Sequence, residues 1–282
     1  MANEILITAE QLAGIAVGES APGGGPLRIL DVRWRLDRPD GRPEYLAGHI
    51  PDAQYVDLDT QLARHGDPAE GRHPLPPVER LQGHVRGWGI DRGDTVVVYD
   101  DLNGLSAARA WWLLRYAGID DVRLLDGALT AWIAAGLPLE MDEVTAPAAG
   151  SATLRYGALP ALTMDEAAGF PEAGVLLDAR AGERYRGEVE PIDPRAGHIP
   201  GARSAPTTEN VAADGRFLAP EQLRARFAAL GVERGKPVAA YCGSGVTAAH
   251  EVVALALAGF DAALFPGSWS QWANHPELPL ER

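Results

Sequence analysis

Short apolar runs recur along the chain, and several of them end at a polar residue. "RILDV" (28–32) and "VLLDA" (175–179) are typical of strands that lead into a polar site. "TVVVYD" (95–100) and "PVAAYC" (237–242) are apolar almost to their ends, as expected for strands buried on both faces of a parallel sheet. The sequence therefore predicts parallel strands whose carboxyl ends carry polar side chains.

Longer segments between these runs have apolar residues at helical spacing. Three of them end in glycine, a common stop signal for helices: "SAARAWWLLRYAG" (106–118), "PEQLRARFAALG" (220–231) and "TAAHEVVALALAG" (247–259). The alternation of strands and helices predicts an α/β fold, in which each parallel sheet has helices on both faces. In such folds the ligand site lies beyond the carboxyl ends of the strands.

The whole pattern is present twice. Segments of the first half recur in the second half at offsets of about 141 to 149 residues: "ILDVR" (29–33) as "LLDAR" (176–180), "AGHIPDA" (47–53) as "AGHIPGA" (196–202), "GWGIDRGDTVVVYD" (87–100) as "ALGVERGKPVAAYC" (229–242), and "GLPLE" (136–140) as "ELPLE" (277–281). Self-similarity of this period predicts a duplicated domain rather than a short solenoid repeat.

Between the two copies lies a segment that has the composition of a linker. "MDEVTAPAAGSATL" (141–154) is rich in small residues and proline and has no sustained apolar periodicity. We predict a first domain over residues 1–142, a linker over 143–157 and a second domain over 158–282.

Charge and cysteine content narrow the classes of function. The net charge of −14 disfavours binding to nucleic acid or to an anionic membrane. No run reaches the ~18 apolar residues of a membrane span, and no signal peptide is visible. A single cysteine suits a reducing compartment. These features lead us to expect a soluble, cytoplasmic protein. We also expect no metal and no cofactor, because no metal-ligand set or nucleotide loop is present.

The only cysteine, Cys242, stands between a predicted strand and a predicted helix, in "CGSGVT" (242–247). Gly243 and Gly245 allow backbone conformations in which successive N–H groups converge on one point. The N-terminus of the following helix adds its positive field, and the hydroxyls of Ser244 and Thr247 can add hydrogen bonds. Such a loop stabilises a thiolate or a persulfide anion. The loop therefore favours a role for Cys242 as a nucleophile, rather than a role as a small apolar side chain buried in the core.

The first copy serves as an internal control for this loop. Asp100 stands at the position of Cys242, and a carboxylate cannot act as a thiolate nucleophile. We therefore expect the first domain to be inactive and to form one wall of a cleft beside the second. Cysteine phosphatases of the C-x5-R type need an arginine six residues after the nucleophile. That position is Ala248 here, which argues against phosphoryl transfer.

Taken together, the duplicated domain, "GHIPGA", "LLDAR…ERYRG" and the "CGSGVT" loop resemble the rhodanese and 3-mercaptopyruvate sulfurtransferase superfamily, over about residues 5–282. The resemblance implies tandem rhodanese-like domains, the N-terminal one inactive and the C-terminal one catalytic. The loop is similar to that of members that use 3-mercaptopyruvate, because members that use thiosulfate typically carry an Arg–Lys pair directly after the cysteine. The implied reaction moves a sulfane sulfur from 3-mercaptopyruvate through a Cys242 persulfide to cyanide, a small thiol or thioredoxin.

The resemblance also implies roles for other residues. It assigns protonation of the leaving enolate to a relay of Ser244, His49 in "GHIP" and an aspartate, for which Asp40 is the candidate, with Asp37 nearby. His49 recurs as His198, so both histidines also suit a structural role in a turn. The residues implied to bind the substrate are Arg184, Arg195, Gly243, Gly245, Val246 and Thr247. The recurring pair of Asp178 and Arg180 is expected to be structural.

The sequence leaves two alternative functions open. The first is a thiosulfate:cyanide sulfurtransferase, since the loop sequence does not fix the donor by itself. The second is a carrier that receives persulfide sulfur from a partner protein and turns over neither small donor.

Overall fold

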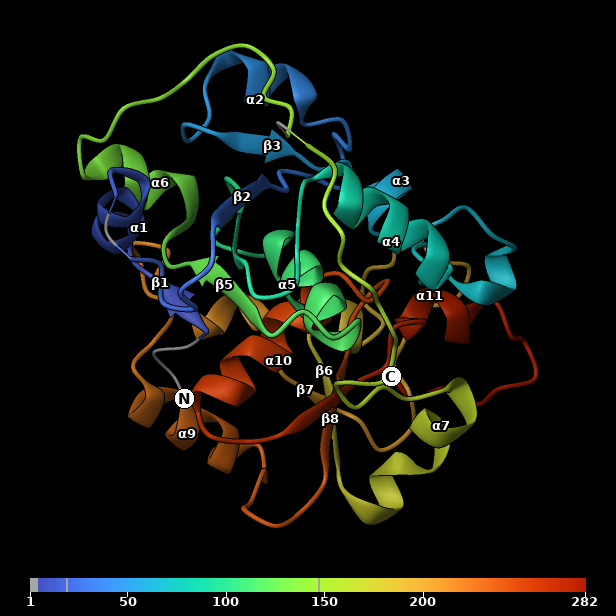
Figure 1. Ribbon diagram of the computed structural model, residues 1–282. Helices are drawn as coiled ribbons and strands as arrows, with labels where there is room; N and C mark the ends of the chain where they lie inside the picture. The colour runs from blue at the N-terminus through green and yellow to red at the C-terminus, as the bar shows by residue number, and fades with distance from the viewer. Residues whose placement is uncertain (1–4, 19, 147) are drawn as a thin grey trace.

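A computed structural model of the chain describes residues 5–18, 20–146 and 148–282 (Figure 1). The first sheet is parallel, in the order β1-β5-β4-β2-β3, with β1 Leu6–Ile7, β2 Leu27–Asp31, β3 Ala53–Tyr55, β4 Thr95–Tyr99 and β5 Asp121–Leu125. The second sheet is also parallel, in the order β7-β6-β8-β9, with β6 Val175–Asp178, β7 Arg203–Ser204, β8 Val238–Tyr241 and β9 Ala262–Leu264. The predicted α/β fold is confirmed.

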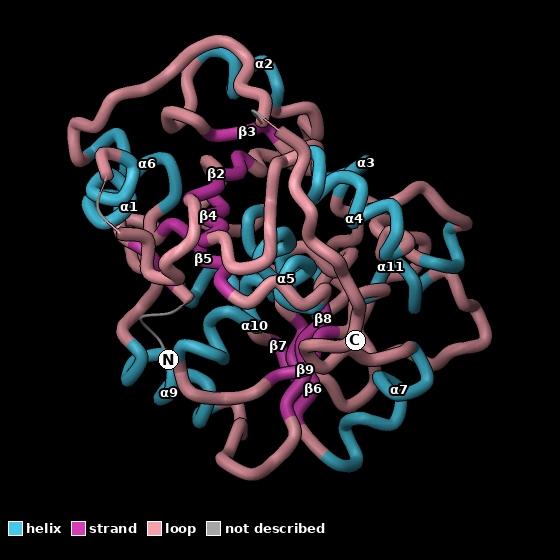
Figure 2. Tube along the Cα trace, viewed as in Figure 1, coloured by secondary structure: helices cyan, strands magenta, loops and turns pink. Residues whose placement is uncertain are grey.

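Helices surround both sheets (Figure 2). In the first half they are α1 Ala9–Ala16, α2 Arg42–Ala47, α3 Leu58–Gln61, the 3-10 turn η2 Pro68–Glu70, α4 Val78–Gly87, α5 Ala107–Tyr116 and α6 Ala128–Ala134. In the second half they are α7 Met164–Ala173, α8 Gly182–Tyr185, the 3-10 turn η3 Thr207–Asn210, α9 Pro220–Ala229, α10 Thr247–Leu257 and α11 Ser268–Ala273.

The two halves repeat each other in register as well as in sequence. In the first sheet the aspartate that ends β2, Asp31, pairs with Tyr99, and in the second sheet Asp178 pairs with Tyr241. The residue after each tyrosine, Asp100 or Cys242, therefore leaves the sheet at the same place. The repeat thus brings one loop of each domain to the carboxyl end of a central strand.

The domains meet along α5 and α10, which lie side by side between the two sheets (Figure 1). Both helices are almost entirely buried, and their apolar side chains belong to one hydrophobic core that spans the two halves. Each sheet has a second, smaller core on its other face. Because the two helices pack against each other and are not exposed to solvent, this seam is a major part of the hydrophobic stabilisation.

The described residues of 143–157 contain no helix and no strand, although parts of this segment are fixed against the first domain. Ala152 and Leu154 are buried, and the guanidinium of Arg86 donates to the Ala152 carbonyl at 2.9 Å. The exact limits of the two domains stay a prediction.

Candidate active site

Cys242 lies at the carboxyl end of β8, where a short loop leads into α10. It is only 2% exposed, and the backbone N–H of Gly245 donates to Cys242 Sγ at 3.2 Å. The backbone N–H of Cys242 in turn donates to the hydroxyl of Ser268, at the start of α11, at 3.1 Å. The sulfur is therefore held inside the loop rather than displayed on the surface.

The shape of this loop requires glycine at position 245. Gly245 has a φ of +76°, and a Cβ there would lie 2.3 Å from the carbonyl oxygen of Pro266. No residue with a side chain fits this place without moving the backbone. Val246 is buried, and Thr247 is the first residue of α10, so both belong to the wall of the loop.

In the first domain the matching loop is filled by a carboxylate. Asp100 is fully buried, and its two oxygens accept hydrogen bonds at 2.8 to 2.9 Å from four backbone N–H groups, those of Leu102, Gly104, Ser106 and Ala107. Converging N–H groups of this kind bind anions. The first-domain loop is therefore an anion cradle that Asp100 fills, whereas one N–H group, that of Gly245, donates to Cys242 Sγ in the matching loop.

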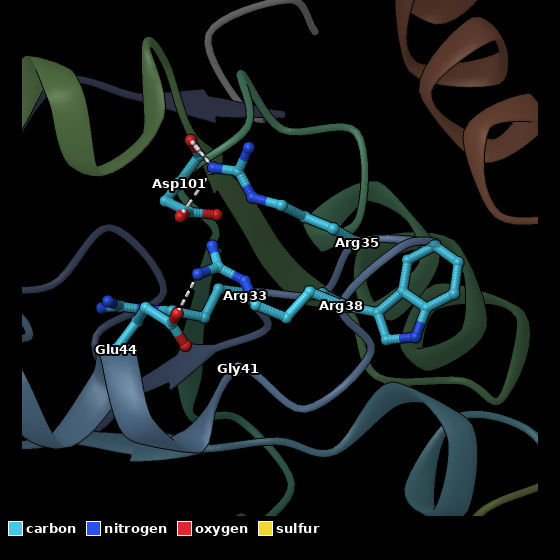
Figure 3. A pocket seen from close by; sticks show the side chains of 7 residues that line it. Arg33, Arg35, Arg38, Gly41, Glu44 and Asp101 are labelled. Atoms are coloured by element: carbon cyan, nitrogen blue, oxygen red, sulfur yellow. Dashed lines mark hydrogen bonds and ion pairs between the residues drawn. The ribbon is translucent and has the colours of Figure 1, made fainter.

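The pocket beside that first-domain loop is closed by ion pairs (Figure 3). Arg35 pairs with Asp101 at 2.8 Å, and Arg38 pairs with Glu44. The space left is about 10 Å³, enough for roughly one water molecule. A sulfur donor has no room in this pocket.

The serine of the Cys242 loop belongs to a hydrogen-bonded relay that crosses the domain seam. Ser244 Oγ lies 2.7 Å from His73 Nδ1, and His73 Nε2 lies 3.1 Å from Asp59 Oδ1. An ionised carboxylate only accepts hydrogen bonds, so Nε2 carries a proton, and Nδ1 of the neutral ring accepts from the Ser244 hydroxyl. Burial lowers the pKa of His73, which keeps its ring neutral near pH 7.

His49 is not part of this relay. Its Nδ1 lies 3.0 Å from the carbonyl oxygen of Ile50, its Nε2 lies 2.9 Å from that of Asp142, and its ring stacks on Tyr45. Both ring nitrogens are thus engaged by backbone within the first domain, and the predicted placement of His49 beside Ser244 is wrong. In the second domain the ring of His198 stacks on Tyr185, and its Nδ1 lies 2.8 Å from the carbonyl oxygen of that residue, while its Nε2 lies 3.5 Å from the carboxylate of Glu281.

Asp40 is also placed elsewhere. It is exposed, and its carboxylate accepts from the backbone N–H of Arg42 at 3.0 Å, at the start of α2. The nearby Asp37 is exposed too. The carboxylate that contacts the relay histidine belongs to Asp59 on α3, so the prediction of Asp40 for this position is wrong.

Two arginines flank Gly243. A Cβ on Gly243 would lie 3.3 Å from Arg72 Nη2 and 3.5 Å from Arg184 Nη1. Both guanidinium groups bind the buried carboxylate of Asp193, Arg72 at 2.5 Å and Arg184 at 3.2 Å. Among the described residues, Arg72 Nε has no hydrogen-bond partner. Arg184, which the sequence indicated, and Arg72, which it did not, bring two cations to the sulfur loop.

Arg195 supports the fold of the second domain instead. Its guanidinium donates at 2.6 to 3.0 Å to four backbone carbonyls, those of Trp272, Ala273, His275 and Leu278. With its donors used in this way, Arg195 fixes the chain after α11. The prediction that it binds the substrate is wrong.

Three residues of the site were not predicted from the sequence, because they lie in the copy that lacks the cysteine: Asp59, Arg72 and His73. One signal was present in the repeat itself. "EGRHPLP" (70–76) matches "DGRFLAP" (214–220), so His73 stands opposite Phe217. A polar side chain whose duplicate is apolar marks a position where the two copies differ in function.

Within the described parts of the chain, no helix is long and apolar enough to cross a bilayer. The same residues contain no group of three or more side chains able to hold a metal ion together.

Comparison with known proteins identifies the family. A model of the rhodanese-like domain matches residues 18–135 and 163–275. The chain belongs to the rhodanese-like family. This rhodanese-like protein is 48% identical to the "Putative thiosulfate sulfurtransferase SseB" of Mycobacterium tuberculosis, over 99% of this chain and 97% of that one. It is 46% identical to the "Probable 3-mercaptopyruvate sulfurtransferase" of Pseudomonas aeruginosa, over 99% of both chains.

Solved structures agree with this assignment. The crystal structure of SseA from Escherichia coli, a 3-mercaptopyruvate sulfotransferase by its description, matches with a TM-score of 0.80 at 34% identity, over 94% of this chain and 98% of that one. A variant of EanB with a cysteine persulfide matches with a TM-score of 0.86 at 26% identity, over 99% of this chain and 70% of that one. The predicted superfamily is confirmed: this rhodanese-like protein is a sulfurtransferase with a small-molecule sulfur donor and an acceptor.

Proposed function

We propose that this protein takes a sulfane sulfur from 3-mercaptopyruvate, holds it as a persulfide on Cys242 and passes it to a thiol or to cyanide. The observation that carries the proposal is the relay from Ser244 through His73 to Asp59, next to the cysteine loop. A proton relay suits a donor whose leaving group is an enolate, because the enolate carbon must be protonated. The names of the relatives from Pseudomonas aeruginosa and Escherichia coli support the same donor.

The reaction proceeds in two displacements at sulfur. The Cys242 thiolate attacks the donor sulfur, so that an S–S bond forms while the C–S bond of mercaptopyruvate breaks and its electron pair goes to the enolate of pyruvate. The thiol proton of the donor ends on the enolate carbon by way of the relay, which leaves pyruvate and a persulfide anion. Cyanide then attacks the outer sulfur, and the departing Cys242 thiolate restores the enzyme.

Arg72 and Arg184 are the proposed binding residues for the donor carboxylate. Both flank Gly243, and the buried Nε–H of Arg72, which has no partner among the described residues, is a spare donor besides the contact to Asp193. We predict that Arg184→Gln raises the KM for mercaptopyruvate about tenfold or more, as expected when a charge-assisted hydrogen bond of roughly 1.5–3 kcal/mol is lost. Steady-state kinetics with Arg186→Gln as the control, an exposed neighbour paired with Glu188, checks this. An unchanged KM in Arg184→Gln contradicts the assignment.

We also propose the finer features that the sequence predicted. Thioredoxin or a small thiol is the proposed physiological acceptor, with cyanide as the laboratory one, and a reducing cytoplasm is the proposed setting. A thiol acceptor must be in its reduced form to take the sulfur from Cys242, which supports a reducing setting. The proposed domain limits remain 1–142 and 158–282.

Thiosulfate is the second candidate donor. The relative from Mycobacterium tuberculosis carries thiosulfate in its name, and the two cations beside Gly243 suit a sulfonate as well as a carboxylate. Against this candidate, the two residues after Cys242 are Gly243 and Ser244, where a cationic pair would be expected.

Initial rates with the two donors decide between the candidates. Thiocyanate production from cyanide is followed across a concentration series of each donor, with Cys242→Ser as the blank. We expect kcat/KM to favour mercaptopyruvate by at least tenfold, about 1.4 kcal/mol in the transition state. A preference for thiosulfate would support the second candidate. Negligible rates with both donors, together with persulfide loading by a partner protein, would identify a carrier.

A further inference from the structure

Arg109 is a fully buried cation at the domain seam. It lies on α5 of the inactive domain, and its guanidinium donates to three backbone carbonyls: those of Leu62 and His73 at 3.2 and 3.0 Å, and that of Gly245 at 3.0 Å. Leu62 and His73 belong to the first domain, whereas Gly245 belongs to the cysteine loop. Arg109 therefore binds both halves of the active site at once.

Among the described residues, no carboxylate pairs with Arg109. The other deeply buried arginines of the sheets are neutralised, Arg33 by Asp31 at 2.5 Å and Arg180 by Asp178 at 2.6 Å. A buried cation without a counter-charge is costly, because the carbonyl dipoles replace only part of its hydration. Burial lowers the pKa of Arg109 to about 10, so the group still carries its charge near neutral pH.

An ionised Cys242 is in a position to compensate this charge. Among the described residues, Cys242 and Tyr156 are acidic groups whose charge acts on Arg109. Tyr156 is neutral at physiological pH, since burial raises the pKa of its phenol and its hydroxyl donates to the Pro76 carbonyl. Gly245, whose carbonyl Arg109 binds, also donates its N–H to Cys242 Sγ. The sulfur and the guanidinium thus both contact the backbone of one residue, Gly245.

The repeat provides a comparison at the matching position. Arg109 stands nine residues after Asp100, and Glu251 stands nine residues after Cys242. Glu251 is fully buried too, but it accepts a hydrogen bond from Asn210 at 2.7 Å and contacts Arg226 at 3.4 Å. The position on α10 that matches Arg109 thus carries an acid with its own partners. The arginine stands on α5, the helix that faces the loop with the thiol.

We propose that Arg109 is the counter-ion of the anionic sulfur on Cys242, supplied in trans by the inactive domain. The inference deepens the proposed function, since both the thiolate and the persulfide of that cycle are anions. Arg109 is a positioning residue: it fixes Gly245 and His73 and compensates the sulfur charge without touching the donor. The inactive domain is then an electrostatic part of the active site.

Other ionisable groups face the same loop, and they differ from Arg109 in exposure or charge. The side chains of Arg72 and Arg184 are 26% and 17% exposed and share the carboxylate of Asp193, so solvent and that anion weaken their field. Glu190 binds Arg184 as well. His73 is neutral, and Asp59 lies behind it.

Direct titration of Cys242 tests the proposal. Because the chain has one cysteine, the ultraviolet absorbance of the thiolate, measured against Cys242→Ser across a pH series, reports this sulfur alone. Arg109→Gln is expected to raise the midpoint by at least about one pH unit, a tenfold loss of thiolate at a given pH. Arg109→Lys, which keeps the charge, is expected to keep the midpoint close to that of the wild type. Arg195→Gln, a guanidinium clamp on carbonyls at another place, should leave the midpoint unchanged.

A folded Arg109→Gln variant with the midpoint of the wild type overturns the proposal, as does a Lys variant that behaves like the Gln variant. If Arg109→Gln does not fold, the salt dependence of the wild-type midpoint decides. A buried counter-ion is hardly screened, so the midpoint should stay constant up to about 0.5 M salt. A steep rise with salt would assign the effect to exposed arginines instead. The titration uses no sulfur donor, so its outcome is independent of whether the proposed donor turns over.

Discussion

The hydroxyl of Ser244 forms a hydrogen bond between the two domains, since its partner His73 lies in the first domain, 171 positions away in the chain. Cys242 could be predicted from the sequence, since its signals are local: the end of an apolar run, two glycines and a helix start. The relay could not be predicted from local signals, since no motif near Asp59 or His73 links them to the cysteine loop; only the comparison of His73 with Phe217 in the repeat marks that position. The recurring "GHIP" motif drew attention to His49, whose ring nitrogens are used by the backbone of a turn.

Replacement of the two histidines separates these roles. His73→Gln should lower kcat with mercaptopyruvate by about 10²–10⁴-fold, the usual contribution of a positioned acid–base group. His49→Gln should retain kcat and lose about 1–3 kcal/mol of stability, since buried carbonyls lose a partner. Steady-state assays and urea denaturation of both variants measure this. Equal loss of kcat in the two variants would remove His73 from the relay.

Glu251 predicts a pH dependence of stability. Burial raises its pKa to about 7 in the folded protein, whereas in the unfolded chain it titrates near 4.3. The folded state therefore binds a proton more tightly, so its contribution to stability is fully present below about pH 4.3 and is lost as the pH rises to about 7. Glu251→Gln should flatten the decline in the free energy of unfolding between pH 5 and pH 7, by up to about 1.4 kcal/mol per pH unit.

Denaturant titrations at several pH values measure that slope. The control is Glu209→Gln, an exposed partner of the same arginine, Arg226, which should keep the slope of the wild type. A wild-type slope in Glu251→Gln as well would assign the dependence to other groups.

At the scale of elements, the sequence predicted the central strands and long helices well. The expected helix over 247–259 is α10, Thr247–Leu257, and that over 106–118 is α5, Ala107–Tyr116. Glycine stop signals and short apolar runs fixed these elements because both are local effects. The loops behave differently: the one after β8 closes around Cys242 only because Pro266 and α11 lie against it.

Substitutions of the two loop glycines should therefore differ. Gly245→Ala forces a side chain into a positive-φ position against the Pro266 carbonyl, and should cost at least about 2 kcal/mol and most of the activity. Gly243→Ala meets only the flexible ends of Arg72 and Arg184, so it should fold normally and raise the KM for the donor. Thermal melts and donor kinetics of both variants check this. A stable, active Gly245→Ala would show that the loop tolerates another backbone path.

At the scale of the molecule, the seam between α5 and α10 makes the two domains one hydrophobic core, to which the fully buried Trp112 belongs. The sequence indicated two domains but not how far they share their interior, because packing between copies leaves no periodic trace. The proposed active site depends on that seam, since Cys242 and Ser244 come from one half and His73 and Asp59 from the other.

The shared core predicts that the halves unfold together. Ellipticity, tryptophan fluorescence and thiocyanate production should be lost at one urea concentration. Trp112→Ala should lower the free energy of unfolding by about 3–5 kcal/mol, through lost burial and a cavity in the shared core. Two separate transitions in the wild type would mean that each domain is stable alone.

The carboxylate in the first-domain loop makes the divergence of the two copies hard to reverse. Asp100→Cys would place a thiol within that ring of N–H groups. Yet the segment that reaches this loop from the second domain carries Phe217 where the active side carries His73, and the seam carries Glu251 where the active side carries Arg109. Each copy provides what the other lacks, so the two copies together form one site, and no single substitution would create a second.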